Sequence, residues 1–385
     1  MQDNETKNKI IVLHYGNVML YPPVISLLDN LIANNRNVVL IAGNTKRLPS
    51  RILEAKNIVV RDMPIDGSSN PLGRLRRRLL LGGAYKNALE SSHDDGDVVW
   101  TTTDSTVRAL NTALKGKKHV LQLMELEESF PLFSGAKVLK FELDEYAREA
   151  WKVVVPERNR AYIQQVMWKL ERVPEVLPNK PYSLDPGNID NAAEELVSQI
   201  SREKRKVIMY LGVMSVDRDL GPFADAVEMM GDEFVLYALG KIPVGQNEAF
   251  KSFLTSHPQV KYLGFFNPPT HLHFLRYAHI GLLPYITNYE SKVISPLNVL
   301  YCAPNKIYEY AGFGVPMVGT DVLGLRIPFE KYNIGVCCKD LKPGSIREAL
   351  SYADENHDRM ASGCRDFYED TDLDAIVKAI LDNPR

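Results

Sequence analysis

Residues 303–321 read APNKIYEYAGFGVPMVGTD, and this stretch contains the signals that decide the fold. Pro304 suits the first turn of a helix, because its fixed φ and missing amide cost nothing there. Gly312 and Gly314 predict the end of that helix, and the apolar residues from Val315 onward predict a buried strand. A helix that leads through glycines into a uniformly apolar strand is typical of α/β sheets.

The same alternation of short apolar strands and longer helix-like stretches runs through all 385 residues. Strands that are apolar throughout belong to parallel sheets with helices on both faces. The strands fall into two series, which predicts two doubly wound α/β domains. The predicted strands are Lys9–His14, Asn37–Gly43, Ile58–Asp62, Asp97–Thr101, His119–Leu123 and Lys152–Val155, then Lys206–Leu211, Phe234–Leu239, Val260–Tyr262, Ile280–Leu283 and Val315–Val318.

A proline-rich segment separates the two series. Residues 175–191, EVLPNKPYSLDPGNIDN, contain three prolines and precede a new amphipathic helix. We therefore expect an N-terminal domain over residues 1–181, a linker and helix over 182–205, and a second domain from 206 to 362. Two such domains hold ligands at the carboxyl ends of their strands, in a cleft between them.

The composition excludes several classes of protein. With 45% hydrophobic residues, 24% charged residues and a formal charge of -2, the chain is neither disordered nor suited as a whole to nucleic acid. The polar start MQDNETKNKI does not resemble a signal peptide, and no apolar run approaches the ~18 residues of a membrane span. The four cysteines lack the C-x-x-C spacing of zinc or redox sites. We expect a cytoplasmic protein with reduced thiols.

Residue types at the start of the predicted helix suit a nucleotide. Asn305 and Lys306 fall at its N-terminus, where free amides and partial positive charge favour phosphate. Glu309 lies one turn further on the same face. A diphosphate followed by ribose hydroxyls matches this order of groups. An ordinary surface Lys–Glu pair explains the same residues equally well.

A resemblance to a known family favours the nucleotide. Residues 304–321 closely resemble the nucleotide-sugar signature of GT-B glycosyltransferases, especially those of family 4. Residues 206–227 and 260–285 resemble the opening and the base-binding part of that family's donor domain, and residues 97–129 and 153–166 resemble its first domain more loosely.

The resemblance implies a fold and an organisation. It implies two Rossmann-like domains that face each other across a cleft, with the acceptor bound by residues 1–181 and the nucleotide sugar by residues 206–362. It also implies that the helix within residues 363–385 returns to the first domain.

The resemblance further implies roles for individual residues. It places Glu309 on the ribose, Asn305 and Lys306 on the phosphates, and Arg218 as the second phosphate cation. Arg218 and Lys306 are then catalytic, because negative charge builds on the diphosphate as the sugar departs. Two cations replace a metal, so we expect no metal and no cofactor beyond the nucleotide sugar. The remaining residues implied around the nucleotide are Gly212, Gly240, Lys241, Gly264 and Phe265.

Two positions depart from the family pattern. Many retaining members carry a second glutamate where this chain has Tyr301, and the usual histidine against the donor sugar is Met124. Kinship therefore favours a retaining enzyme, although these residues do not establish the stereochemistry.

The acceptor requires a group in the first domain. Glu125 follows the strand His119–Leu123, and we expect it to point into the cleft, where neighbouring acids and apolar walls make a carboxylate easier to protonate, as a base requires. The alternative is a helix-start acid stabilised by the dipole, which accounts well for Glu127 and Glu128. Asp104 is interpreted as a helix N-cap.

The first strand ends in a turn that suits close approach of a ligand. Gly16 and Asn17 follow it, ahead of a helix that contains Pro22 and Pro23. We expect backbone amides there to approach a ligand at the N-terminus of the helix, although a plain tight turn explains the residues as well.

A basic segment predicts contact with a membrane. Arg74, Arg76, Arg77 and Arg78 lie in NPLGRLRRRLLLGGAYK, which as a helix is basic and apolar together. Such a helix docks to anionic headgroups or to a lipid-diphosphate acceptor at ~1 kcal/mol per basic residue. A solvated helix face is the alternative.

These features together favour a glycosyltransferase that moves a sugar from a nucleoside diphosphate donor, with UDP favoured, to a lipid-linked or polysaccharide acceptor in surface glycan synthesis. Two alternatives remain. One is a GT-B sugar-nucleotide epimerase, and the other is a silent partner subunit that binds the donor, which Tyr301 and Met124 motivate.

Overall fold

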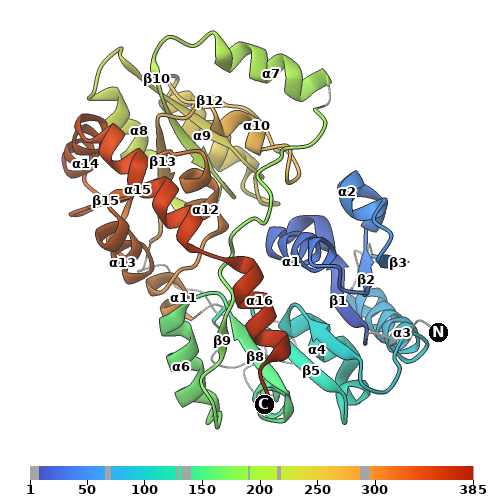
Figure 1. The fold of residues 1–385 in the computed structure, drawn as a ribbon. Helices are drawn as coiled ribbons and strands as arrows, with labels where there is room; N and C mark the ends of the chain where they lie inside the picture. The colour runs from blue at the N-terminus through green and yellow to red at the C-terminus, as the bar shows by residue number, and fades with distance from the viewer. Residues whose placement is uncertain are drawn as a thin grey trace. The chain divides into compact units, whose positions relative to one another are not determined.

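The computed structural model describes residues 8–65, 71–126, 130–131, 140–189, 191–214, 218–286 and 295–384, and leaves out the side chains of 71–79, 130–131 and 140. The chain divides into two compact units, coloured along the sequence in Figure 1. Unit 1 comprises Met1–Ser183, Lys292–Ser295 and Asp372–Arg385, and unit 2 comprises Leu184–Ser291 and Pro296–Thr371.

Unit 1 is built on a seven-stranded parallel sheet of order β3-β2-β1-β4-β5-β8-β9. Its register pairs Ile10 of β1 with Val38 of β2 on one side and with Val98 of β4 on the other. A short antiparallel pair, β6 and β7, lies outside the sheet. The strands are β1 (Ile10–Asn17), β2 (Val38–Gly43), β3 (Ile58–Met63), β4 (Val98–Thr101), β5 (Lys118–Gln122), β6 (Phe130–Pro131), β7 (Lys140–Phe141), β8 (Lys152–Val155) and β9 (Glu175–Val176).

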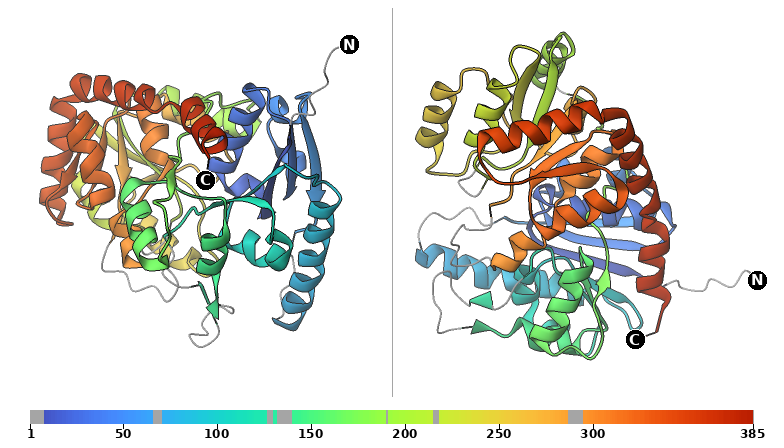
Figure 2. Two further views of the ribbon diagram at one scale, coloured as in Figure 1. Left: turned by 60° about the horizontal axis from the view of Figure 1, so that its bottom comes forward. Right: turned by 90° about the vertical axis from the view of Figure 1, so that its left-hand side faces the viewer.

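Helices cover both faces of this sheet (Figure 2). Alternate residues of β1 divide between two cores, because successive strand side chains point to opposite faces. Val12 packs with residues of α1 and α16, whereas Ile11 and Leu13 pack with residues of α3 to α6. The helices are η1 (Val18–Leu20), α1 (Pro22–Ala33), η2 (Thr45–Arg47), α2 (Ser50–Leu53), α3 (Pro71–Glu90), α4 (Asp104–Leu110), η3 (Asn111–Leu114), α5 (Leu143–Glu149), α6 (Arg158–Trp168) and α16 (Leu373–Asp382).

Unit 2 has a six-stranded parallel sheet of order β12-β11-β10-β13-β14-β15. Its central strand β10 again divides its side chains, with Met209 in the core that contains residues of α10, α12 and α15, and Tyr210 in the core of α8, α9 and α14. The strands are β10 (Lys206–Leu211), β11 (Phe234–Leu239), β12 (Lys261–Tyr262), β13 (Ile280–Leu283), β14 (Met317–Thr320) and β15 (Gly335–Cys338). The helices are α7 (Asn191–Ser201), α8 (Gly221–Glu228), α9 (Asn247–Ser256), α10 (Leu272–Leu275), α11 (Pro296–Leu300), α12 (Asn305–Gly312), α13 (Leu323–Tyr332), α14 (Pro343–Glu355) and α15 (His357–Asp370).

The prediction of two α/β units with parallel sheets is confirmed, and the differences lie at the edges. β9 and β15, each the last strand of its sheet, were not predicted. β15 reads GVCC and is only partly buried, so it lacks the apolar run that marks the inner strands. β14 begins at Met317 rather than Val315, because Pro316 has no amide hydrogen to give to a ladder.

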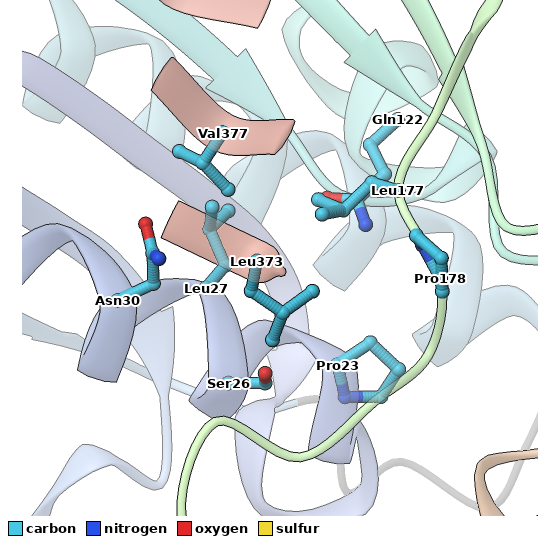
Figure 3. A pocket seen from close by; sticks show the side chains of 9 residues that line it. All are labelled: Pro23, Ser26, Leu27, Asn30, Gln122, Leu177, Pro178, Leu373 and Val377. Carbon is cyan, nitrogen blue, oxygen red and sulfur yellow. The ribbon is translucent and has the colours of Figure 1, made fainter. Parts of the chain in front are cut away.

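The end of the chain is divided between the units. α15 belongs to unit 2, where Cys364 and Phe367 are buried in its core, so the segment that joins unit 1 begins near residue 372 rather than 363. The α16 side chains Leu373 and Val377 line a small pocket with residues of α1, including Leu27 (Figure 3). The N-terminal unit is therefore completed by the last helix of the chain.

None of the described helices has both the length and the apolar composition needed to cross a bilayer.

If α16 is part of the core of unit 1, truncating its buried face should destabilise the protein. Ile380 is 1% exposed, and Ile380→Ala should lower the free energy of unfolding by about 2–5 kcal/mol, the usual cost of such a cavity. Lys378, on the exposed face of the same helix, supplies the control, since Lys378→Ala should change the free energy of unfolding by less than about 0.5 kcal/mol. Denaturant unfolding measures both, and equal effects would show that α16 is not a core element.

Candidate functional site

Three glycines end the neighbouring strands β10, β11 and β12. The amide of Gly212 donates to the carbonyl of Leu239 at 2.9 Å, and the amide of Gly240 donates to the carbonyl of Gly264 at 2.8 Å. A Cβ at Gly240 would lie 1.6 Å from the carbonyl oxygen of Gly212, so no larger residue fits there. The carboxyl edge of this part of the sheet therefore carries bare backbone, which a ligand can approach closely.

A buried tyrosine fixes α12 against this sheet. The hydroxyl of Tyr310 donates to the carbonyl of Met209 at 2.8 Å and accepts from the amide of Leu211 at 3.1 Å, both in β10. Its ring occupies the space that a Cβ at Gly281 would need, and burial raises the pKa of the Tyr310 hydroxyl well above its usual value. The register of α12 on the sheet is thus set by one side chain.

Lys306 lies beside the end of β10. Its Nζ is 5.6 Å from the centroid of the Tyr210 ring, and a Cβ at Gly212 would lie 2.6 Å from that Nζ. Asn305 is the first residue of α12, and Pro304 is the N-cap rather than the first helical residue as the sequence suggested. The structure thus brings a cation next to the glycine edge.

Glu309 is buried, with 5% of its surface exposed. Its Oε1 lies 3.1 Å from Nε2 of His271, and the described residues offer its second oxygen, Oε2, no partner. The alternative of a surface Lys–Glu pair is therefore wrong. His271 could not be predicted, because a single histidine between Thr270 and Leu272 fits no motif.

Arg218 lies near the end of β13. The guanidinium carbon is 4.1 Å from the centroid of the Tyr285 ring, a stacked cation–π contact. The amide of Tyr285 donates to Oγ1 of Thr320 at 2.9 Å, which ties the exit of β13 to β14. The chain thus holds this cation through an aromatic residue anchored to the sheet.

Lys241 and Phe265 lie beyond the ends of β11 and β12. Both are exposed, and Phe265 has 44% of its surface open next to Gly264. The carbonyl of Lys241 accepts from the amide of Met214 at 2.9 Å, which joins the segments after β10 and β11. An exposed aromatic ring beside a glycine offers a face on which a base can stack.

The glycine edge generates a prediction. Gly240→Ala places a methyl group against the Gly212 carbonyl. Neither backbone segment can move away without disturbing the hydrogen bond between Gly240 and Gly264. The free energy of unfolding should therefore fall by more than about 3 kcal/mol. Gly344→Ala is the control, because no atom lies within 4 Å of its Cβ position in α14, and it should be neutral or slightly stabilising. Thermal unfolding checks both, and a neutral Gly240→Ala would contradict the tight edge.

In unit 1, a buried histidine ends β1. Nδ1 of His14 lies 2.9 Å from the hydroxyl of Thr102, which itself donates to the carbonyl of Leu13 at 3.0 Å. The hydroxyl therefore accepts from His14, so Nδ1 carries the hydrogen and the enclosed Nε2 is a bare acceptor without a partner among the described residues. Burial lowers the pKa of His14 to about 3. The ring of Tyr21 packs against the His14 ring, with 4.3 Å between the two ring centroids.

Glu125 and Asp104 both lie in surroundings that differ from those expected. Glu125, after β5, is exposed rather than walled by apolar side chains, so the enclosure that we expected is absent. Asp104 is not the N-cap of α4, because Thr103 caps the helix by accepting from the amide of Thr106. Burial raises the pKa of Asp104, and the charges of Asp104 and Glu125 both help to raise that of Tyr21. Both carboxylates thus lie near Tyr21.

The expectation for Gly16 and Asn17 is wrong in its mechanism. A 3-10 turn, η1, separates them from α1, so they are not at the N-terminus of that helix. The amide of Gly16 donates to the hydroxyl of Tyr85 at 3.3 Å, and the side chain of Asn17 accepts from the amide of Met19 and from Nδ2 of Asn44. These contacts tie the turn to α3 and to the residue that follows β2.

Several predicted residues lie outside what the structure describes. Glu127 and Glu128 are among them, and so are the side chains of Arg74, Arg76, Arg77 and Arg78, of which only the backbone in α3 is described. Within the described ranges, no group of three or more His, Cys, Asp or Glu side chains is arranged to hold a metal ion.

The two buried histidines of unit 1 predict a pH dependence. Burial lowers the pKa of both His14 and His119 to about 3, below the 6.5 of an unfolded histidine. Between these values the unfolded chain binds more protons, so stability falls as the pH drops below 6.5, by roughly 1.4 kcal/mol per pH unit for each histidine.

The variant His14→Asn keeps a donor to Thr102 and removes one titrating group. Denaturant unfolding between pH 7 and 5 should show a smaller loss of stability for this variant than for wild type. Parallel curves for the two proteins would mean that His14 is not held neutral by burial.

The chain was compared with protein-family models, curated protein sequences and solved structures. No protein-family model and no curated protein sequence matches the chain. Among solved structures it resembles HepE of Anabaena in complex with UDP and glucose, at 14% identity and a TM-score of 0.69 over 97% of this chain and 98% of that one.

Two further solved structures are similar to this chain over nearly its whole length. A glycosyltransferase from Rickettsia africae matches at 13% identity and a TM-score of 0.64, over 98% of this chain and 97% of that one. Sucrose-phosphate synthase from Thermosynechococcus elongatus matches at 12% identity and a TM-score of 0.65, over 96% and 94%. These structural similarities extend over both units, although few residues are identical. They therefore identify the fold: the chain has the GT-B fold of nucleotide-sugar glycosyltransferases.

Proposed function

We propose that the protein is a glycosyltransferase that transfers a sugar from a UDP-sugar to a lipid-linked or polysaccharide acceptor. The observation that carries the proposal is Glu309, a buried carboxylate on α12 whose Oε1 lies 3.1 Å from Nε2 of His271 and whose Oε2 has no partner among the described residues. A buried anion with unused acceptor capacity favours a ligand that brings hydroxyl donors, as a ribose does. HepE, which shares the fold, has been solved with UDP and with UDP-glucose.

The diphosphate is proposed to bind at the amino end of α12. Asn305 and Lys306 occupy its first two positions, and Lys306 Nζ lies next to bare backbone at Gly212. We assign Arg218 as the second cation. As the bond between sugar and phosphate breaks, negative charge grows on the diphosphate, and fixed cations stabilise that charge without rearrangement. These two residues supply the role that a metal has in other transferases, and we propose that the reaction needs none.

The base is proposed to lie over the ends of β11 and β12. The exposed ring of Phe265 and the side chain of Lys241 flank the backbone at Gly240 and Gly264. Stacking on an aromatic face is worth ~1–3 kcal/mol for a nucleobase. Phe265 directly follows Gly264, so the proposed base site adjoins the same glycine edge as the proposed phosphate site.

The acceptor is proposed to bind to unit 1, with Glu125 contacting its hydroxyl. The guanidinium of the buried Arg160 donates to the carbonyl of Met124 at 3.1 Å, which fixes the segment that carries Glu125. Retention of configuration, which we propose from the family resemblance, requires less of a base than inversion does. An exposed carboxylate is adequate for that task.

The setting is proposed to be surface glycan synthesis at an anionic membrane. The support is the sequence of α3, in which Arg74 and Arg76–Arg78 alternate with or adjoin leucines. Such a helix brings a peripheral enzyme to a lipid-linked acceptor, because anionic headgroups attract basic residues near the surface.

The role of Glu309 predicts a loss of nucleotide affinity on substitution. Glu309→Gln removes the charge that accepts the ribose hydroxyls, and UDP should bind about 10- to 100-fold more weakly, as expected for hydrogen bonds to a charged group. Glu330→Gln, an exposed glutamate on α13, should bind UDP as wild type does. Isothermal titration with UDP measures both, and an unchanged affinity of Glu309→Gln would contradict the assignment.

Turnover separates the proposal from its alternatives. Labelled UDP-glucose and other UDP-sugars are incubated with and without lipid extracts and oligosaccharides, and transfer should require an acceptor. Quantitative conversion of the donor alone would instead identify an epimerase. Binding of UDP without turnover on any acceptor would favour the silent subunit.

A further inference from the structure

A tyrosine at the end of β13 contacts the cation that we assign as the second phosphate ligand. The guanidinium carbon of Arg218 lies 4.1 Å from the centroid of the Tyr285 ring. Tyr285 is 6% exposed and belongs to the apolar core that also contains Ile307 of α12. Its amide donates to Oγ1 of Thr320, the last residue of β14. The ring is therefore anchored to the sheet, and the longer arginine side chain is the partner with more freedom to move.

Lys306 is held in a similar way at the neighbouring strand. Its Nζ lies 5.6 Å from the centroid of the buried Tyr210 ring, within the range of a cation–π contact. Tyr210 pairs with Leu282 across β10 and β13, so the two tyrosines come from the carboxyl ends of adjacent strands. Both cations that we assign to the diphosphate thus contact an aromatic face at this edge of the sheet.

An aromatic face holds a cation differently from a carboxylate. A carboxylate neutralises a guanidinium and accepts hydrogen bonds from the N–H groups that a phosphate needs. The negative face of a ring attracts the guanidinium and leaves its charge and its N–H groups to other partners. An arginine that is already held in place also loses less conformational freedom when a ligand binds. The contact with Tyr285 therefore favours a cation that is arranged for an anion in advance.

We propose that Tyr285 is a positioning residue that holds Arg218 in place for the diphosphate, so that it contributes to the affinity for nucleoside diphosphates but not for nucleosides. The inference rests on the proposed function, because it assumes that Arg218 contacts the diphosphate. A merely structural Tyr285 predicts another result: its loss would weaken every ligand equally, whether or not Arg218 is present. A double-mutant cycle between the two residues separates these roles.

The variants differ in whether an aromatic face remains beneath Arg218. Tyr285→Phe keeps the face, whereas Tyr285→Leu and Tyr285→Met replace it with apolar side chains. Each is also combined with Arg218→Ala. Tyr352→Leu is the matched control, because the Tyr352 hydroxyl also contacts an arginine, Arg359, but lies on α14 in a groove with Phe234, the first residue of β11. Thermal melting confirms each fold, isothermal titration measures the affinity for UDP, and ligand-observed NMR measures the affinity for uridine.

Wild type should bind UDP at least about tenfold more tightly than uridine, because charged hydrogen bonds to the phosphates are strong. Tyr285→Leu and Tyr285→Met should weaken UDP by about 3- to 30-fold, the range of a cation–π contact, and change uridine by less than about twofold. Tyr285→Phe and Tyr352→Leu should bind UDP within about twofold of wild type. In the Arg218→Ala background, which itself binds UDP more weakly, replacing Tyr285 should change the affinity for UDP by less than about twofold.

An equal loss for UDP and uridine, or an undiminished effect of Tyr285→Leu in the Arg218→Ala background, overturns the positioning role and leaves the proposed function intact. If Arg218→Ala binds UDP as wild type does, the contact of Arg218 with the diphosphate is refuted, and the role of Tyr285 with it. If wild type binds UDP no more tightly than uridine, the proposed diphosphate site itself is refuted.

A second measurement decides the matter if the apolar variants do not fold. In a crystal structure with UDP, the Arg218 guanidinium should contact a phosphate while it remains over the Tyr285 ring. A guanidinium that leaves the ring in order to reach the phosphate overturns the proposal.

Discussion

The hydrogen bonds of the Tyr310 hydroxyl to β10 are the constraint on which the rest of unit 2 depends. They fix α12 along the sheet, with the ring seated over Gly281, where no side chain competes for the space. From that register follow the place of Lys306 beside the glycine edge and the place of Glu309 opposite His271. An α12 shifted by one residue would rotate both charged side chains away by about 100°.

A buried carboxylate with few polar contacts is costly in the absence of ligand, because a desolvated anion needs several donors. Unit 2 tolerates this cost at Glu309, whereas the buried Tyr310 hydroxyl nearby both donates and accepts a hydrogen bond. The missing donors are what a ribose would bring. The same reasoning applies more weakly to unit 1, where His14 retains an unused acceptor and Asp104 is held in surroundings that disfavour its charge.

Much of the architecture could be predicted from sequence, because apolar strands and glycine punctuation are local signals. The helix of residues 305–312 follows from residue types alone, whereas Gly212 and Gly240 were expected near the nucleotide only through the family resemblance. The partner of Glu309 could not be predicted, since His271 reaches it from 38 residues earlier in the chain through tertiary packing. The surroundings of Glu125 and Asp104 could not be predicted either, because burial at a strand end depends on the neighbouring helices. Thr103 takes the capping role that was expected of Asp104, and Asp104 is partly buried.

The central claim is that Glu309 recognises a ribose through the oxygen that His271 leaves unused. A crystal structure of the protein with UDP tests it most directly. The account predicts Oε2 of Glu309 at ~2.5–3.0 Å from a ribose hydroxyl. UDP bound elsewhere on unit 2, or a ribose that makes no contact with Glu309, would contradict it.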